Sequence, residues 1–203
     1  MVKYHYSKLM ESRDIIRPIL AGLVGIGLVV LVIVLIIKAF SGGPSAPSSR
    51  IDITKYANTP GASVTVLADG PTNIDQDHDQ VKITVGNSSN QIDIIQGYQG
   101  TVTNSQSYPN NSAAFGAFLQ TINLMNFSKG KSSNVDYRGF CPTGSRYIFT
   151  FNNGTSNLFS YWATSCGKQG TFEGSTSQVL QQIRLQIPQN DFDKLTNNIP
   201  IGF

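Results

Sequence analysis

Charged residues are scarce in this chain: of its 203 residues, only 13% are Asp, Glu, Lys or Arg. The formal net charge of +3 arises in the first 50 residues, because from Ile51 onward nine Lys and Arg stand against ten Asp and Glu, a net charge of −1 (9 − 10). Binding to a nucleic-acid backbone requires a broad basic surface. We therefore expect no nucleic-acid partner for the region that follows residue 50.

Histidine is also nearly absent, since the chain has two and only His78 follows residue 50. A Ser-His-Asp hydrolase would have to use this residue, yet no serine lies in a G-x-S-x-G motif. A phosphate-binding glycine loop and a dinucleotide fingerprint are missing as well. These absences predict a protein that is not an enzyme and uses no cofactor. An enzyme would instead place His78 or a carboxylate cluster in a deep pocket.

Metal-binding patterns are limited to one acidic stretch. Asp75, Asp77 and Asp79 have the spacing of the first three ligands of an EF-hand loop. Gln80 occupies the position of the required glycine, however, and Gly86 that of the bidentate glutamate. Two interpretations remain for the three aspartates, a calcium site of another type and an acidic surface turn, and we expect the surface turn.

The most prominent feature that is present is an apolar run from Ile19 to Ile37, which contains no charge. As a helix it would extend ~28 Å, close to the thickness of the hydrocarbon core of a bilayer. We predict a transmembrane helix at 19–40 after a cytoplasmic segment at 1–18. Four Lys or Arg precede the run and two follow it before residue 51, so the positive-inside rule places the N-terminus in the cytoplasm.

Two further interpretations concern this segment. The tripeptide at 39–41, Ala-Phe-Ser, resembles a signal-peptidase site, although the apolar run is longer than that of most cleaved signals. Ala21 and Gly25 form a small-xxx-small pair that would allow a weak homodimer through the membrane helix. Residues 41–50 are rich in Gly, Pro and Ser and predict a spacer, which leaves 51–203 as an extracytoplasmic domain.

The pattern of apolar residues in this domain predicts its fold. Alternation predicts five strands, at 63–68, 80–85, 91–103, 146–151 and 158–164. Apolar spacings of three and four predict helices at 111–125 and 175–185 and a short helical stretch at 191–197. The third strand contains Gly97 and Gly100 and is expected to bend or bulge there. The order β-β-β-α-β-β-α predicts an α+β domain, an antiparallel sheet with two or three helices packed on it.

The only two cysteines, Cys141 and Cys166, both follow the predicted membrane segment. A hairpin turn expected at Asn153-Gly154 lies midway between them and would bring both to the open end of the hairpin. A redox pair would need a CxxC spacing and a structural zinc site four ligands, and neither is present. We predict a Cys141–Cys166 disulfide, in keeping with an oxidising compartment.

Aromatic side chains concentrate on the same predicted hairpin. The candidates for a binding surface are Tyr147, Phe149, Phe151, Tyr161 and Trp162. Alternation places the first three on one face of the sheet, where core packing is the default interpretation. An exposed aromatic patch would instead mark a recognition surface.

Several segments resemble a known group of proteins. These are GFCPTGSRYIFTF at 139–151, SYWATSCG at 160–167, TFEG at 171–174, the QIP that ends a predicted helix, and GYQGTVTNSQSYPNNSAAFGAFL at 97–119. Across about residues 80–190 the chain is similar to uncharacterised single-pass surface proteins of Saccharibacteria and related candidate-phyla bacteria. The resemblance implies an N-terminal anchor, an outward-facing domain and one disulfide, and it implies no catalytic residues.

We therefore expect a single-pass protein of the cell membrane whose outer domain has a non-enzymatic binding or adhesion role. Its expected partners are the membrane and another envelope protein, a wall polymer or a host surface. The alternative is a structural subunit of an envelope secretion or pilus-type assembly, in which the membrane helix itself packs within a complex.

Overall fold

A computed structural model describes residues 51–131 and 135–202, and the structural statements below concern these residues. They belong to one compact unit, Ser48–Phe203. The segments predicted at 1–18, 19–40 and 41–50 lie outside the described residues. Within the described ranges, no helix is both long and apolar enough to cross a bilayer.

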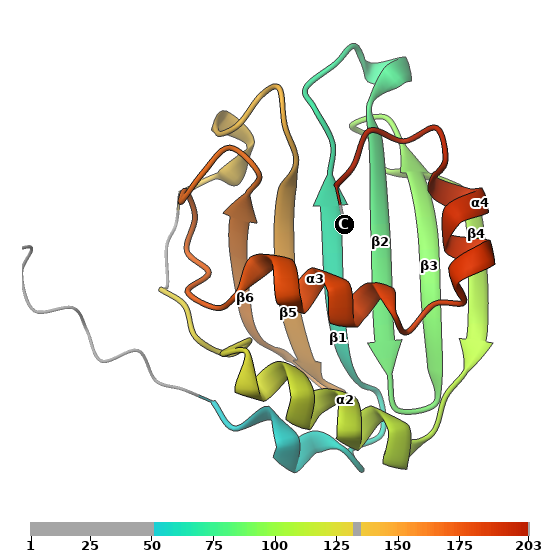
Figure 1. Ribbon diagram of the computed structural model, residues 1–203, viewed down its shortest axis with the longest axis vertical. Helices are drawn as coiled ribbons and strands as arrows, with labels where there is room; N and C mark the ends of the chain where they lie inside the picture. The colour runs from blue at the N-terminus through green and yellow to red at the C-terminus, as the bar shows by residue number, and fades with distance from the viewer. Residues whose placement is uncertain (1–50, 132–134, 203) are drawn as a thin grey trace, which may run out of the picture. The chain divides into compact units, whose positions relative to one another are not determined.

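The described residues form one six-stranded sheet with helices on one of its faces (Figure 1). The strands are β1 (Ala62–Asp69), β2 (Asp79–Gly86), β3 (Ser89–Gln96), β4 (Thr101–Pro109), β5 (Arg146–Asn153) and β6 (Asn157–Thr164). The helices are α2 (Ser112–Leu124), α3 (Thr176–Arg184) and α4 (Gln189–Thr196), with short 3-10 turns η1 (Ile53–Tyr56), η2 (Asp75–Asp77) and η3 (Tyr137–Gly139). The sheet order is β4-β3-β2-β1-β5-β6, and every neighbouring pair is antiparallel. The predicted α+β class is confirmed.

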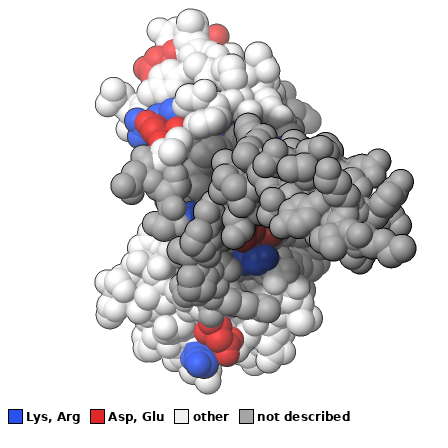
Figure 2. Space-filling model, turned by 90° about the vertical axis from the view of Figure 1, so that its left-hand side faces the viewer, with Lys and Arg blue, Asp and Glu red and all other residues white. Residues whose placement is uncertain are grey.

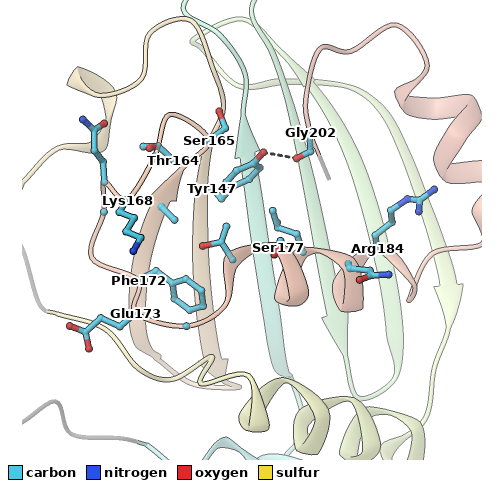
Figure 3. A pocket seen from close by; sticks show the side chains of 17 residues that line it. Tyr147, Thr164, Ser165, Lys168, Phe172, Glu173, Ser177, Arg184 and Gly202 are labelled. Carbon is cyan, nitrogen blue, oxygen red and sulfur yellow. Dashed lines mark hydrogen bonds between the residues drawn. The ribbon is translucent and has the colours of Figure 1, made fainter.

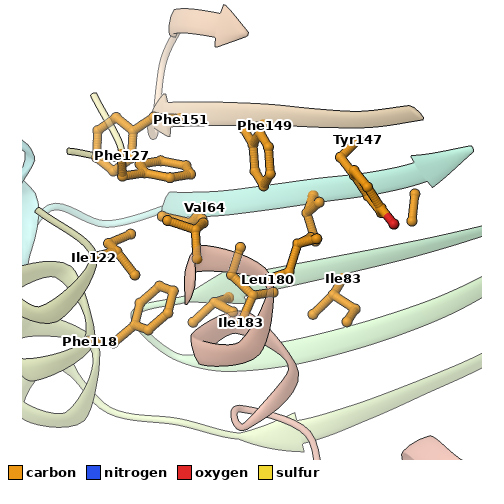
Figure 4. Close-up of a cluster of buried hydrophobic side chains, with 14 of the residues drawn as sticks. Val64, Ile83, Phe118, Ile122, Phe127, Tyr147, Phe149, Phe151, Leu180 and Ile183 are labelled. Atoms are coloured by element: carbon orange, nitrogen blue, oxygen red, sulfur yellow. The ribbon is translucent and has the colours of Figure 1, made fainter. Parts of the chain in front are cut away.

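Alternation in the strands produces the core, as expected from the sequence. In β1 the side chains of Val64, Val66 and Ala68 are buried beneath the helices, whereas Thr65 on the opposite face bonds Thr84 across the ladder. The aromatic side chains of β5 point to the same helical layer (Figure 4). One face of the sheet therefore supplies the core and the other carries polar side chains.

The helices close this core through the predicted apolar spacing. Phe118 and Ile122 of α2 and Ile183 of α3 are buried against the sheet (Figure 4). Asn111 caps α2 by accepting a hydrogen bond from the N–H of Ala114, 2.9 Å away. The predicted short third helix is also present, as α4 after Pro188.

The predicted third strand was wrong in one respect, because it is two strands joined by a tight turn. β3 ends at Gln96 and β4 begins at Thr101, so four strands rather than three precede α2. Gly97 and Gly100 both have φ of +74°, a left-handed conformation that glycine adopts without strain, and the N–H of Gly100 donates to the carbonyl of Gly97. Both glycines thus serve to reverse the chain.

The C-terminal segment returns across the helical face to β5. After α4 the chain runs to Gly202, whose carbonyl accepts a hydrogen bond of 2.6 Å from the hydroxyl of Tyr147. The N–H of Ile201 donates to Ile199 on the way. The hydrogen bond between Tyr147 and Gly202 holds the C-terminal tail beside the start of β5. The tail forms one wall of a cavity there.

Candidate functional site

The predicted disulfide is confirmed and lies next to this cavity. Cys141 and Cys166 are bonded, with their Cα atoms 5.5 Å apart. The bond joins the segment before β5 to the segment after β6. Ser165, beside Cys166, accepts a hydrogen bond of 2.8 Å from the N–H of Ser145. The ends of both strands are therefore held together covalently and by hydrogen bonding.

The segment after the disulfide folds back along the outer edge of β6. The N–H groups of Thr171 and Phe172 both donate to the carbonyl of Trp162, at 2.8 and 3.0 Å. The N–H of Trp162 in turn donates to the hydroxyl of Thr171. Gly170, at φ +138°, packs so closely on β6 that a Cβ would collide with the backbone of Trp162 and Ala163. This return covers the edge of β6 from Trp162 to Thr164 and forms a second wall of the cavity.

A cavity of about 910 Å³ lies between this segment, α3 and the C-terminal tail (Figure 3). Its apolar surface comes from Ala163, Phe172 and Leu180 and from the ring of Tyr147. Its polar lining comes from Thr164, Ser165, Lys168, Gln169, Glu173, Thr176, Ser177, Gln181 and Arg184. In Figure 3, Lys168 lies on the β6 side and Arg184 on the far side, with Tyr147 and Phe172 between them. The volume is in the range of small-molecule sites.

Positive charge predominates around the cavity. Glu173 is paired with Lys129 at 3.7 Å and Lys131 at 3.2 Å, so its charge is already compensated. Arg184 contacts Asp193 at 3.1 Å, whereas exposed Lys168 makes no ion pair with any described residue. Among the residues that line the cavity, the cations Lys168 and Arg184 stand against the anion Glu173, a net charge of +1 (2 − 1).

A further feature leaves polar groups available at the cavity. Ser175 precedes α3 but its side chain makes no capping hydrogen bond, and Thr176 and Ser177 of the first turn line the cavity. The N-terminal end of a helix carries partial positive charge. The local electrostatics therefore favour a ligand with a negative or hydrogen-bond-accepting group.

Tyr147 is fixed in its protonated form at neutral pH. Burial raises the pKa of its phenol, and this effect exceeds the opposing one of a hydrogen bond from Ser145. The phenol therefore acts as a donor to Gly202 and not as a base. Its role is to hold the tail and to present the edge of its ring to the cavity.

The candidate catalytic residue His78 lies elsewhere, in a buried polar cluster at the ends of β1 and β2. Its Nε2 lies 2.8 Å from Asp69 Oδ1, its Nδ1 lies 3.1 Å from the carbonyl oxygen of Pro71, and its ring stacks on Tyr98 at 4.1 Å. Asp69 Oδ2 accepts a 2.8 Å hydrogen bond from Nε of Arg146. His78 is fully buried and does not line the cavity, so it holds the fold together there.

The aspartates of the acidic stretch do not converge. Asp75 Oδ1 accepts a hydrogen bond of 2.6 Å from the N–H of Tyr98, Asp77 lies in η2, and Asp79 belongs to β2 opposite Gln96. Across 51–131 and 135–202, no three His, Cys, Asp or Glu side chains are arranged to hold a metal ion. The geometry of the described residues offers no support for the calcium interpretation.

The aromatic candidates serve mainly as core. Tyr147, Phe149 and Phe151 lie on the helical face and are buried, as alternation predicted for one face. Trp162 is buried on the opposite face against Phe140, with ring centroids 4.9 Å apart. Tyr161 is half-buried and stacks on Phe159. The exposed aromatic patch is therefore not formed, and of the five only Tyr147 reaches the cavity.

Sequence reasoning did not identify Lys168, Phe172 or Arg184 as site residues. The available signal was the pair Gly170 and Gly174 in the segment after the disulfide, since glycines in such a segment are typical of a chain that packs closely on other backbone.

The described charges on the side of the molecule that faces the viewer in Figure 2 form small groups of mixed sign among uncharged residues.

Comparisons with protein-family models, with curated proteins and with solved structures find no match to the chain.

Proposed function

We propose that this protein is a membrane-anchored, extracytoplasmic binding module without enzymatic activity, and that its ligand occupies the cavity beside α3. The observation that carries the proposal is the cavity of about 910 Å³, which combines an apolar floor with a rim of net positive charge. Largely preformed concave sites with a few convergent polar groups are typical of ligand binding. His78, the histidine that catalysis would need, is committed to the fold.

The lining supports a ligand with a compact apolar or sugar-like body and one anionic group. Phe172 and Leu180 suit the body, because flat apolar surfaces bind the carbon faces of a ligand. Lys168 and the uncapped first turn of α3 suit a carboxylate or phosphate. On an outer envelope, fragments of an anionic wall polymer have this chemistry.

The predicted membrane anchor, the predicted Gly/Pro/Ser spacer and the resemblance of the sequence to surface proteins of Saccharibacteria support an outward location for the domain. The Cys141–Cys166 disulfide is consistent with that location, since such bonds persist in oxidising compartments.

The test uses the full chain in lipid nanodiscs, titrated with soluble anionic wall fragments (muropeptides and teichoic-acid oligomers) and followed by calorimetry. Lys168→Ala should weaken binding about 2- to 5-fold, the range expected for one exposed ion pair. Ser177→Trp, which places an indole in the cavity, should abolish binding. Lys55→Ala is the matched control, because it removes the same charge from η1, outside the cavity lining.

Failure of every fragment to bind, or binding that Ser177→Trp leaves unchanged, would contradict the proposal.

A structural subunit of an envelope assembly is the second candidate function, and the observation that favours it is an uncovered sheet edge at β4. Replacing the membrane segment with an unrelated one separates the two roles, because a binding module tolerates the exchange and an assembly subunit does not.

A further inference from the structure

The outer edge of β4 carries peptide groups without partners. Asn110 donates its N–H to Ser88 of the β2–β3 turn, so the bonds to the neighbouring strand recur at every second residue, through Tyr108, Gln106 and Asn104. Ser105 and Ser107 therefore direct their N–H and carbonyl groups away from the sheet. Neither group has a backbone partner among the described residues.

Apart from one bulge at Thr103, β4 lacks the features that protect an edge strand. Its nine residues include no charged side chain, and its only proline, Pro109, is the last residue. The irregularity in the ladder lies opposite Ile94 and Ile95 and leaves the half from Asn104 to Tyr108 regular. Lys residues, internal prolines and short length are the usual protection against strand pairing. An exposed strand of this kind is a template for another strand.

The identity of the added strand follows from the side chains of β4. The middle of β4 carries polar, neutral side chains, namely Asn104, Ser105, Gln106 and Ser107. They therefore offer no charge that would select a partner strand of opposite charge. Two copies of the same neutral strand meet without charge repulsion, and their free backbone N–H and carbonyl groups can bond one another across the new ladder. A two-fold axis makes such a contact closed and identical on both sides.

We propose that β4 pairs antiparallel with β4 of a second copy of this chain, forming a continuous sheet of twelve strands, six from each copy. One strand pair buries little surface, so the contact is weak in free solution. Attachment of both copies to one membrane raises their effective concentration and makes the dimer form there. The contact is independent of the cavity and of its ligand.

The test places a charge on the edge of the full chain in lipid nanodiscs large enough to hold two copies. Ser107 is exposed and its hydroxyl makes no hydrogen bond with a described residue, so its replacement leaves the fold intact. Ser107→Lys and Ser107→Glu should each shift sedimentation or mass photometry from dimer to monomer. An equimolar mixture of the two variants should restore the dimer, because the facing charges are then opposite.

Ser160→Lys is the control, because it places the same charge on β6 at the opposite edge of the sheet, and it should leave the dimer unchanged. Ser107→Cys gives a second readout without charge: oxidation should cross-link it between copies, whereas Ser160→Cys should form the dimer without a cross-link. The proposal is overturned if the wild-type chain is monomeric in the membrane, or if the dimer persists in Ser107→Lys without cross-linking of Ser107→Cys. Ligand binding by the cavity is measured separately, so its loss or retention does not bear on this result.

Discussion

Two polar regions of this domain use similar residues in opposite ways. In the buried cluster, Asp69 accepts hydrogen bonds from His78, Gln80 and Arg146, and Arg146 donates further to Gly70 and Thr72. Every charge there has a partner inside the protein. At the cavity, Lys168 makes no ion pair with any described residue and the side chain of Ser175 leaves α3 uncapped.

This difference distinguishes the polar groups that stabilise the fold from those that are available to a ligand. Buried charges are tolerated only when they are paired and hydrogen-bonded, so the cluster is costly to disturb. Exposed or unpaired polar groups contribute little to folding and are available to a ligand. The residues that resemble a catalytic set by type, His78 and Asp69, therefore belong to the fold.

The largest effect is expected from Arg146→Met, which leaves Asp69 buried and without its cation. Removing one partner of a buried ion pair typically costs about 3–5 kcal/mol. Urea unfolding should show a loss of this size. Arg184→Met at the cavity, where the cation is partly exposed, should cost about 1 kcal/mol or less. Equal losses in the two variants would remove the distinction between the regions.

Removing the disulfide by Cys141→Ser with Cys166→Ser should lower the free energy of unfolding by about 2–4 kcal/mol, as for a loop of this length. The bond also fixes the wall of the cavity, so ligand affinity should fall in the same variant. Thermal unfolding with and without reductant provides the measurement. A wild-type protein whose stability is indifferent to reductant would show that the bond is not formed in the cell.

A smaller effect is expected from the acid titration of Asp93, a carboxylate on the polar face of the sheet that is paired with Lys82. Burial alone would raise its pKa, but hydrogen bonds from Ser105, Gln91 and Lys82 outweigh burial, so its pKa lies below the ordinary value of 3.8. A lowered pKa contributes stability at pH values above 3.8, and this contribution is lost as the pH falls through the folded-state pKa.

Asp93→Asn should therefore reduce stability at neutral pH by roughly 1 kcal/mol and flatten the loss of stability below about pH 4. Chemical unfolding at a series of pH values checks this. An acid dependence identical to wild type would assign the titration to other carboxylates.

The smallest effect on folding is expected from Lys168→Ala. Because this exposed side chain has no ion pair with a described residue, the free energy of unfolding should change by less than about 0.5 kcal/mol. Binding of an anionic wall fragment should nevertheless weaken. A stability loss comparable to that of Arg146→Met would place Lys168 in the fold and not in the site.

Local patterns predicted most of the architecture. The alternation in β1, β2, β5 and β6 and the apolar spacing of α2 and α3 were read correctly, because these periods reflect one buried face. The turn at Gly97–Gly100 was missed because β4 is exposed on both faces, so alternation gave no sign of a separate strand. The pairing of Cys141 with Cys166 followed from a turn midway between them.

The sequence by itself determined the class of the domain, its disulfide and the face of each element that is buried, because these depend on periodicity and on short separations along the chain. Tertiary structure alone decided that His78 is buried against Asp69 and that Tyr147, Lys168 and Arg184 surround one cavity. It also decided that the end of β6 at Trp162–Thr164 is covered while the outer edge of β4 is open. The physical reason is that strand order and the return of the C-terminal tail join residues far apart in sequence, and no local pattern encodes such pairings.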